Sequence, residues 1–112
     1  MDEHFLYLTT TGRTSGEPRR IEIWYVAHGG RHYLISERRG ESHWVRNIQR
    51  DPAVTFSVGT RADHAASLPP TRATGRVVED RDEPELASAV RALMDAKYGW
   101  SDGLIVELSP RG

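Results

Sequence analysis

Apolar and polar residues alternate along much of this 112-residue chain, and this period predicts strands. Residues 5–10 are rich in aromatic residues and threonine, which favours an extended strand. A second alternating segment covers residues 21–26. It leads into His28-Gly29-Gly30-Arg31, which predicts a tight hairpin turn because paired glycines readily adopt positive φ angles. Residues 33–35 are expected to form the returning strand.

Two segments show a helical period instead. Ser42 is a suitable N-cap for a short helix from His43 to about Arg50. A longer helix is predicted from about Glu83 to Lys97, with acidic residues in its first turn and Gly99 at its end. The apolar stripe of this second helix comprises Leu86, Ala89, Val90, Leu93 and Met94.

The rest of the chain predicts more strands. They are expected at residues 53–58, 72–78 and 104–108, with a weaker candidate at 64–68, and Gly75 would allow a bulge. Six or seven strands in meanders with two short helices indicate a mainly β protein, built as an antiparallel barrel with helices at its ends. No repeat or linker interrupts the pattern, so residues 1–112 are expected to form a single domain.

Composition narrows the class of protein. The sequence has no cysteine, which excludes disulfides and thiolate chemistry and fits a cytoplasmic location. No apolar run reaches the length of a membrane span, and the acidic start is unlike a signal peptide. A formal net charge of -1 argues against a nucleic-acid partner. The charge is uneven, because residues 1–50 carry eight arginines against six acids and the remainder carries an excess of acids.

Several common catalytic arrangements are missing from the sequence. The histidines His4, His28, His32, His43 and His64 lack the spacing of a metal-ligand set, so we interpret them as surface residues and expect no metal. There is no Gly-x-Ser-x-Gly elbow, no Gly-x-Gly-x-x-Gly loop and no Walker loop. These absences argue against the commonest hydrolases and nucleotide-binding enzymes.

The polar segment at residues 9–20 has the composition of an anion site. Gly12 and Gly16 let the backbone approach a ligand and turn its N–H groups toward it. Threonine and serine side chains supply hydroxyl groups, and three arginines supply guanidinium forks that suit phosphate or carboxylate. An ordinary polar turn with solvated arginines is the alternative interpretation of this composition.

A second basic pair, Arg38-Arg39, follows the returning strand of the predicted hairpin. If the hairpin strands run their full length, this pair lies at the same end as Arg19-Arg20. Four arginines at one rim repel one another unless an anion or carboxylates neutralise them. Neighbouring glutamates could do part of this, so both interpretations of the polar turn stay open.

Three segments resemble a known family. Residues 8–19, LTTTGRTSGEPR, are similar to the opening motif of the deazaflavin-dependent nitroreductases, a branch of the pyridoxamine-phosphate-oxidase-like split-barrel superfamily. Residues 43–54, HWVRNIQRDPAV, resemble that family's Trp-x-x-Asn segment, and residues 105–110 resemble its closing strand. This chain has Thr14 where the family commonly has lysine, and a shorter loop before Trp44.

The resemblance implies a split β-barrel that binds coenzyme F420 and passes a hydride to a small planar organic acceptor. The turn would hold the phosphate and acidic tail, and the segment after the returning strand would run along the ring or the ribityl chain. The implied coenzyme-binding residues are Arg13, Thr14, Ser15, Arg19, Arg20, Ser36, Glu37, Arg38, Arg39 and Trp44. No nucleophile is required, and Tyr98 and Ser36 are the candidates to give the acceptor a proton or a hydrogen bond.

Other ligands and assemblies fit the same resemblance. FMN would replace F420 in an oxidoreductase of the pyridoxamine-phosphate-oxidase type. A non-catalytic split barrel would instead bind a flavin, a tetrapyrrole or a lipid. Some family members have an additional N-terminal helix that this sequence lacks, so we expect a homodimer with the coenzyme at or near the subunit interface.

Overall fold

The computed structural model describes residues 5–59 and 70–111, which form seven strands and two α-helices. The strands are β1 (Phe5–Thr11), β2 (Pro18–Ile23), β3 (Val26–His28), β4 (Arg31–Ser36), β5 (Ala53–Gly59), β6 (Thr71–Val78) and β7 (Leu104–Pro110). The helices are α1 (His43–Arg50) and α2 (Pro84–Tyr98), with a short 3₁₀ turn η1 (Arg39–Glu41) before α1. The weak strand candidate at 64–68, with His4 and His64, lies outside the described residues.

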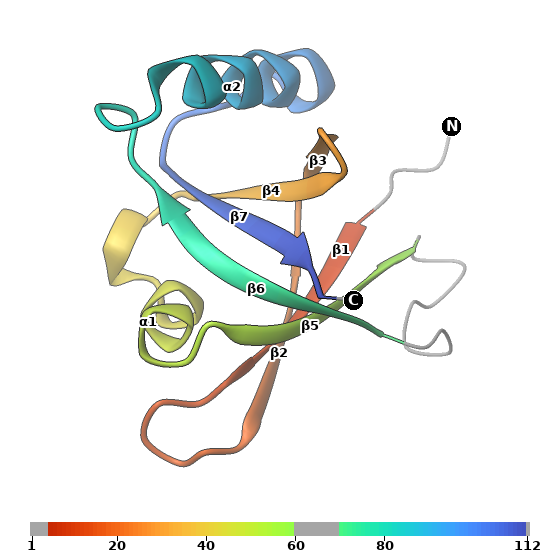
Figure 1. Ribbon diagram of the computed structural model, residues 1–112, viewed down its shortest axis with the longest axis vertical. Coiled ribbons are helices and arrows are strands. Elements are labelled where there is room, and N and C mark those ends of the chain that lie inside the picture. The colour runs from red at the N-terminus through yellow and green to blue at the C-terminus, as the bar shows by residue number, and fades with distance from the viewer. Residues whose placement is uncertain (1–4, 60–69, 112) are drawn as a thin grey trace.

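The strands make one antiparallel sheet in the order β2-β1-β5-β6-β7-β4-β3. Its two edge strands, β2 and β3, are consecutive in the chain and are joined by Trp24 and Tyr25 alone. The sheet therefore curls on itself, with α1 beside β5 and β6 and with α2 across the β4 and β7 end (Figure 1). This is the mainly β architecture with two helices that the sequence predicts.

Alternating side chains divide the apolar residues into two cores. The inner face of the sheet and α1 enclose the first, which includes Leu34, Val106 and Leu108. The opposite face and α2 enclose the second, which includes Ile35 and Ile105. Because successive residues of a strand point to opposite faces, β4 and β7 supply both cores and are buried on both sides.

The hairpin turn is confirmed, since Gly29 and Gly30 have φ angles of 60° and 79° and His28 pairs with Arg31. The strand before it is not continuous. It breaks after Ile23, so that β2 pairs with β1 while only the short β3 pairs with β4. No bulge occurs at Gly75 in its pairing with β7. A Cβ there would lie 3.0 Å from Cγ2 of Ile48, so this glycine lets α1 pack closely on β6.

Both helices lie where they are predicted, with differences in detail. Ser42 is the N-cap residue of α1, but its side chain makes no capping hydrogen bond. Gly99 ends α2 with a φ of 71°. The apolar stripe of α2 is correct at Val90 and Met94, whereas Leu93 is exposed.

A buried carboxylate ties together three neighbouring strands. Glu107 on β7 accepts hydrogen bonds from the Tyr33 hydroxyl (2.8 Å), from Nε of Arg76 (2.9 Å) and from the Ser109 hydroxyl. Burial alone raises the pKa of Glu107, but the hydrogen bonds outweigh it, so its pKa is lowered. Arg76 is held in turn by Glu83, just before α2.

Replacing Tyr33 with phenylalanine removes one donor to this buried carboxylate and changes little else in shape. We expect the free energy of unfolding to fall by about 1–3 kcal/mol, the usual range when a buried polar group loses a partner. Urea denaturation at neutral pH measures the difference. A variant as stable as the wild type would contradict a stabilising role for the bond between Tyr33 and Glu107.

His32 is partly buried, which differs from the surface position predicted for the histidines. Its ring lies 4.7 Å from the Phe56 ring, and its buried Nδ1 has no partner among the described residues. Desolvation first, and then the charge of Lys97, lower the pKa of His32. The folded state therefore favours the neutral ring.

This lowered pKa gives stability a pH dependence with a definite sign. His32 contributes fully to the free energy of unfolding above about pH 6.5, the pKa of histidine in the unfolded chain. This contribution is lost as the pH falls through the lower pKa that His32 has in the folded protein. His32→Phe should therefore lose less stability than the wild type between about pH 7 and pH 5. Urea midpoints at both pH values test this. Equal losses in the two proteins would contradict it.

Candidate functional site

The connection between β1 and β2 is a compact turn built by its own backbone. The amide of Gly12 donates to the carbonyl of Glu17 (2.8 Å), and the amide of Gly16 donates to the carbonyl of Gly12 (2.8 Å). The Glu17 amide donates to the Ser15 hydroxyl. These three N–H groups are used inside the turn, contrary to the expectation that the glycine amides face a ligand. The two glycine amides are thus not available to a ligand.

Gly12 is required by close packing. A Cβ at this position would lie 2.9 Å from Oγ of Ser15 and 3.1 Å from the Glu17 carbonyl oxygen. The Ser15 side chain and the Glu17 backbone therefore occupy the space that a larger side chain at this position would need. Gly16 instead meets nothing within 4 Å and is needed for its φ of 73°.

Asn47 of α1 anchors the turn. Its Oδ1 accepts hydrogen bonds from the backbone amide of Arg13 (3.2 Å) and from Nη1 of Arg13 (3.0 Å). Its Nδ2 donates to the Thr10 hydroxyl (3.1 Å), and the Asn47 side chain is almost fully buried. Nη2 of Arg13 also donates to Nδ1 of His43 (3.2 Å). Arg13 is therefore largely engaged in fixing the turn to the helix.

Above the turn lies a cavity of about 710 Å³, here called the turn cavity. It is lined by the turn, by the start of β2, and by His43, Trp44 and Asn47 of α1. Arg13, Arg19 and Arg20 all reach it, and no carboxylate is among the described residues that line it. The turn cavity therefore has an excess of positive charge.

Arg19 and Arg20 are only lightly engaged. The guanidinium of Arg19 lies 3.9 Å from the Glu17 carboxylate and 3.5 Å from the Ser15 hydroxyl, with both charged side chains mostly exposed. Exposed pairs of this kind contribute little energy. The guanidinium of Arg20 lies over the Tyr7 ring, 4.7 Å from its centroid. Either arginine can turn toward an anion at small cost.

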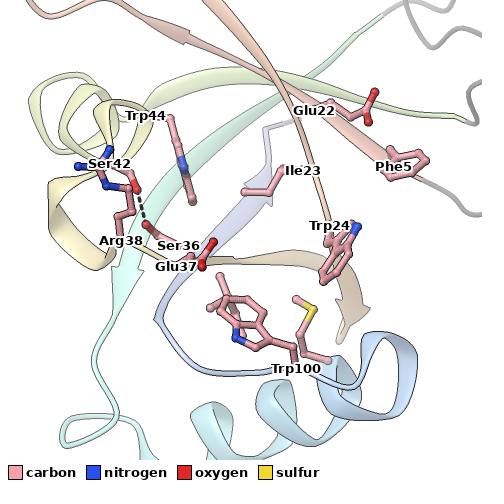
Figure 2. Close-up of a pocket in the computed structure, with 12 residues that line it drawn as sticks. Phe5, Glu22, Ile23, Trp24, Ser36, Glu37, Arg38, Ser42, Trp44 and Trp100 are labelled. Atoms are coloured by element: carbon pink, nitrogen blue, oxygen red, sulfur yellow. Dashed lines mark hydrogen bonds between the residues drawn. The ribbon is translucent and has the colours of Figure 1, made fainter.

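A second cavity, of about 700 Å³, is here called the tryptophan cavity. Trp24, Trp44 and Trp100 line it, and Figure 2 shows them around a common space. The other apolar lining residues are Phe5, Ile23, Ile35 and Met94, and the polar ones are Glu22, Ser36, Glu37, Arg38 and Ser42. Broad aromatic walls with a few polar groups suit a flat, largely apolar ring.

Trp44 lines both cavities. It stands on α1 three residues before Asn47, so one side of the helix carries both the anchor of the turn and the residue shared by the cavities. The two spaces therefore adjoin at its indole. A ligand with an anionic tail and a flat ring could place its two ends in two chemically matched environments.

Ser36 is not free to give up a proton. Its hydroxyl donates to the Arg39 carbonyl oxygen (2.8 Å), and it lies 2.6 Å from the Ser42 hydroxyl. A hydroxyl has one proton, so Ser42 must be the donor between the two serines. This geometry argues against Ser36 as a proton source and assigns it to holding the η1 segment.

Tyr98 differs even more from its expected role. Its hydroxyl donates to the Tyr25 carbonyl oxygen (3.1 Å) and accepts from the Tyr25 amide (3.2 Å), and it is not among the residues that line the tryptophan cavity. The hydroxyl is thus bound to backbone, away from the cavity.

The predicted meeting of four arginines at one rim does not occur. Arg38 lines the tryptophan cavity, whereas Arg39 pairs with Asp102 (3.1 Å) and lines a separate surface pocket. The prediction was wrong because it assumed one continuous hairpin, while β2 pairs with β1 and β4 pairs with β7. Of the ten predicted coenzyme-binding residues, all except Arg39 line at least one of the two adjoining cavities.

Other residues of the site were not identified from the sequence. Asn47 lies within the Trp-x-x-Asn segment and could have been found there. Trp24 lies in the connection between β2 and β3, Met94 lies within α2, and Trp100 follows the end of that helix. No local sequence pattern groups these three residues. Among the described residues, no group of three or more His, Asp or Glu side chains could hold a metal ion.

Replacing Asn47 with alanine should weaken the site through the turn. Thr10 loses a buried side-chain partner, and Arg13 loses two partly buried hydrogen bonds. We expect a loss of about 1–3 kcal/mol in unfolding free energy and faster hydrogen exchange at the Arg13 amide. Urea denaturation and exchange measured by NMR test this. An unchanged Arg13 amide would contradict the role of Asn47 as anchor.

Comparison with known families gives one match along most of the chain. The model of a family described as F420H2-dependent quinone reductase matches residues 1–99. A comparison with curated proteins gave no significant match. No described helix is long and apolar enough to cross a membrane.

Several solved structures share the fold. The heme storage protein HutZ from Vibrio cholerae is 19% identical, with 96% of this chain and 82% of that chain covered and a TM-score of 0.73. A structure described as a domain-swapped dimer is 17% identical, with coverages of 97% and 82% and a TM-score of 0.67. The F420-H2 dependent reductase FDR-A is 20% identical, with coverages of 97% and 96% and a TM-score of 0.56. These likenesses confirm the split-barrel fold.

Proposed function

The chain belongs to the F420H2-dependent quinone reductase family and is an oxidoreductase that uses coenzyme F420, and from this premise we propose how its two cavities divide the work. The turn cavity takes the phosphate and acidic tail of the coenzyme. The tryptophan cavity takes the flat ring and, beside it, a small planar acceptor. The observation that carries this proposal is the sharing of Trp44 by the two cavities.

The donors of the turn cavity fit the coenzyme's tail. Arg19 and Arg20 offer guanidinium groups without a strong competing partner, and Thr14 and Ser15 add hydroxyls. Guanidinium forks bind phosphate and carboxylate oxygens strongly. Arg13 acts mainly by fixing the turn on α1. Thr14 supplies a neutral hydroxyl where the family commonly has lysine, so Arg19 and Arg20 carry most of the charge.

Bound F420H2 supplies the hydride, and the protein orients the partners and excludes water. The indoles and aliphatic residues of the tryptophan cavity desolvate a flat ring. Within the described residues, no hydrogen bond or ion pair engages the side chains of Glu37 and Arg38, both of which line this cavity. Arg38 can therefore stabilise negative charge that develops on an acceptor oxygen. These surroundings favour neutral planar acceptors, such as quinones or nitroaromatics.

Arg19→Ala should weaken F420 binding about tenfold or more, because a charge-assisted contact to the acidic tail is lost. The weakening should shrink at high salt. Titration of the protein with F420, followed by tryptophan quenching, measures it. Arg72→Ala is the matched control, since Arg72 is an exposed arginine of β6 that lines neither cavity.

FMN and heme serve as competing ligands in the same titration. FMN has one phosphate and no acidic tail, so it should bind more weakly than F420 and depend less on the two arginines. Equal affinity of wild type and Arg19→Ala for F420 would contradict the proposed tail site. Tight binding of FMN without binding of F420 would favour the flavin alternative, and tight binding of heme alone would favour the non-catalytic tetrapyrrole-binding alternative.

We also propose that the protein forms a homodimer. Leu93 on α2 is a large apolar side chain that is 38% exposed, and a partner subunit would cover it. One structural neighbour is described as a domain-swapped dimer. Light scattering at micromolar concentration should give twice the chain mass of 12.6 kDa. A monomer would contradict this part of the proposal.

A further inference from the structure

The break between β2 and β3 leaves a corner whose backbone needs other partners. Tyr25 lies between the two strands, so its amide and carbonyl belong to neither ladder. The Tyr98 hydroxyl satisfies both groups, accepting from the amide (3.2 Å) and donating to the carbonyl (3.1 Å). The Lys97 ammonium donates to the same carbonyl oxygen (2.8 Å). The end of α2 thus replaces a missing strand at this corner.

The same contacts fix an aromatic wall. The Trp24 indole stacks on the Tyr98 ring with centroids 4.4 Å apart and an interplanar angle of 2°. Lys97 Nζ lies 3.9 Å from the Tyr25 ring centroid and 5.0 Å from that of Tyr98. One face of the indole is therefore covered from outside the cavity. A side chain stacked and bonded in this way loses rotamer freedom before any ligand arrives.

Trp24 is nevertheless open on the side of the cavity. It is 40% exposed and lines the tryptophan cavity, which Tyr98 does not. In Figure 2 its indole extends from the corner toward Trp100, across the space from Trp44. What Trp24 offers to the cavity is the part of its ring that Tyr98 leaves uncovered. A flat ring placed there would extend the Tyr98–Trp24 stack by one layer.

Trp24 also lies apart from the turn cavity, where the anionic tail is proposed to bind. Trp44 reaches both cavities, whereas Trp24 lines the tryptophan cavity alone. A coenzyme whose tail lies on Arg19 and Arg20 meets Trp44 first. Trp24 and Trp100 line the part of the tryptophan cavity that lies away from Trp44.

We propose that the Trp24 indole is the stacking surface for the planar acceptor, and that Tyr98 and Lys97 are positioning residues that hold it in place. This inference rests on the proposed division of the two cavities. The acceptor class that it selects is neutral and aromatic, with at least one ring face free for stacking. Tyr98 acts through Trp24 and does not itself touch the acceptor.

The test uses 1,4-naphthoquinone as the probe with the full chain. Trp24→Leu should raise the KM for naphthoquinone about tenfold and leave the KM for F420H2 unchanged, because one aromatic stacking contact is lost. Trp24→Phe retains a ring and should restore most of the affinity. Tyr98→Phe keeps the stack but loses the backbone bonds, and should raise the naphthoquinone KM about threefold.

Tyr33→Phe is the matched control for the loss of a hydrogen-bonded tyrosine hydroxyl. It should lower stability without changing either KM, because Tyr33 bonds Glu107 and lines neither cavity. Near-ultraviolet circular dichroism of the coenzyme-free protein gives an independent readout. The signal of the Trp24–Tyr98 stack should persist in Tyr98→Phe and disappear in Trp24→Leu.

Equilibrium dialysis of naphthoquinone against the coenzyme-free protein separates this inference from the coenzyme proposal. Failure of the coenzyme proposal would appear as absent F420 binding in the wild type, whatever happens at Trp24. The stacking inference would be overturned if Trp24→Leu, folded by circular dichroism, bound naphthoquinone as tightly as the wild type. It would also be overturned if Tyr33→Phe raised the naphthoquinone KM as much as Tyr98→Phe.

Discussion

The hydrogen bonds of the buried Asn47 amide are the constraint on which the site depends. They hold the β1–β2 turn against α1 through Thr10 and Arg13. The same helix presents Trp44 one turn earlier, at the place where the two cavities adjoin. If the turn moved away from α1, the arginines of the turn cavity would no longer lie beside Trp44, the residue that both cavities share. A single polar side chain thus sets the relation between charge and apolar surface.

The curled sheet supplies the second half of this arrangement. Its edge strands β2 and β3 meet at a two-residue corner, and the end of α2 satisfies the backbone there. The cost of leaving the strand ladder is offset by hydrogen bonds and by the Trp24–Tyr98 stack. The break in the sheet therefore places an indole at the cavity, where a continuous strand would have paired with a neighbour.

The local elements were predictable because their signals are local. Paired glycines specified the hairpin at Gly29, alternation specified the strands, and a helical stripe specified α2. The corner at Trp24 was missed, because an alternating segment gives no sign that its two halves pair with different strands. That error also misplaced Arg39. The composition of the turn indicated an anion site, but the role of Asn47 depends on a contact across more than thirty residues.

The shared position of Trp44 can be tested with the indole N–H signals of a ¹⁵N-labelled protein. The sequence has three tryptophans, so each signal can be assigned by single replacement. F420 added alone should shift the Trp44 signal most, and naphthoquinone added afterwards should shift that of Trp24. An F420 titration that moves Trp24 or Trp100 while leaving Trp44 unchanged would contradict the account.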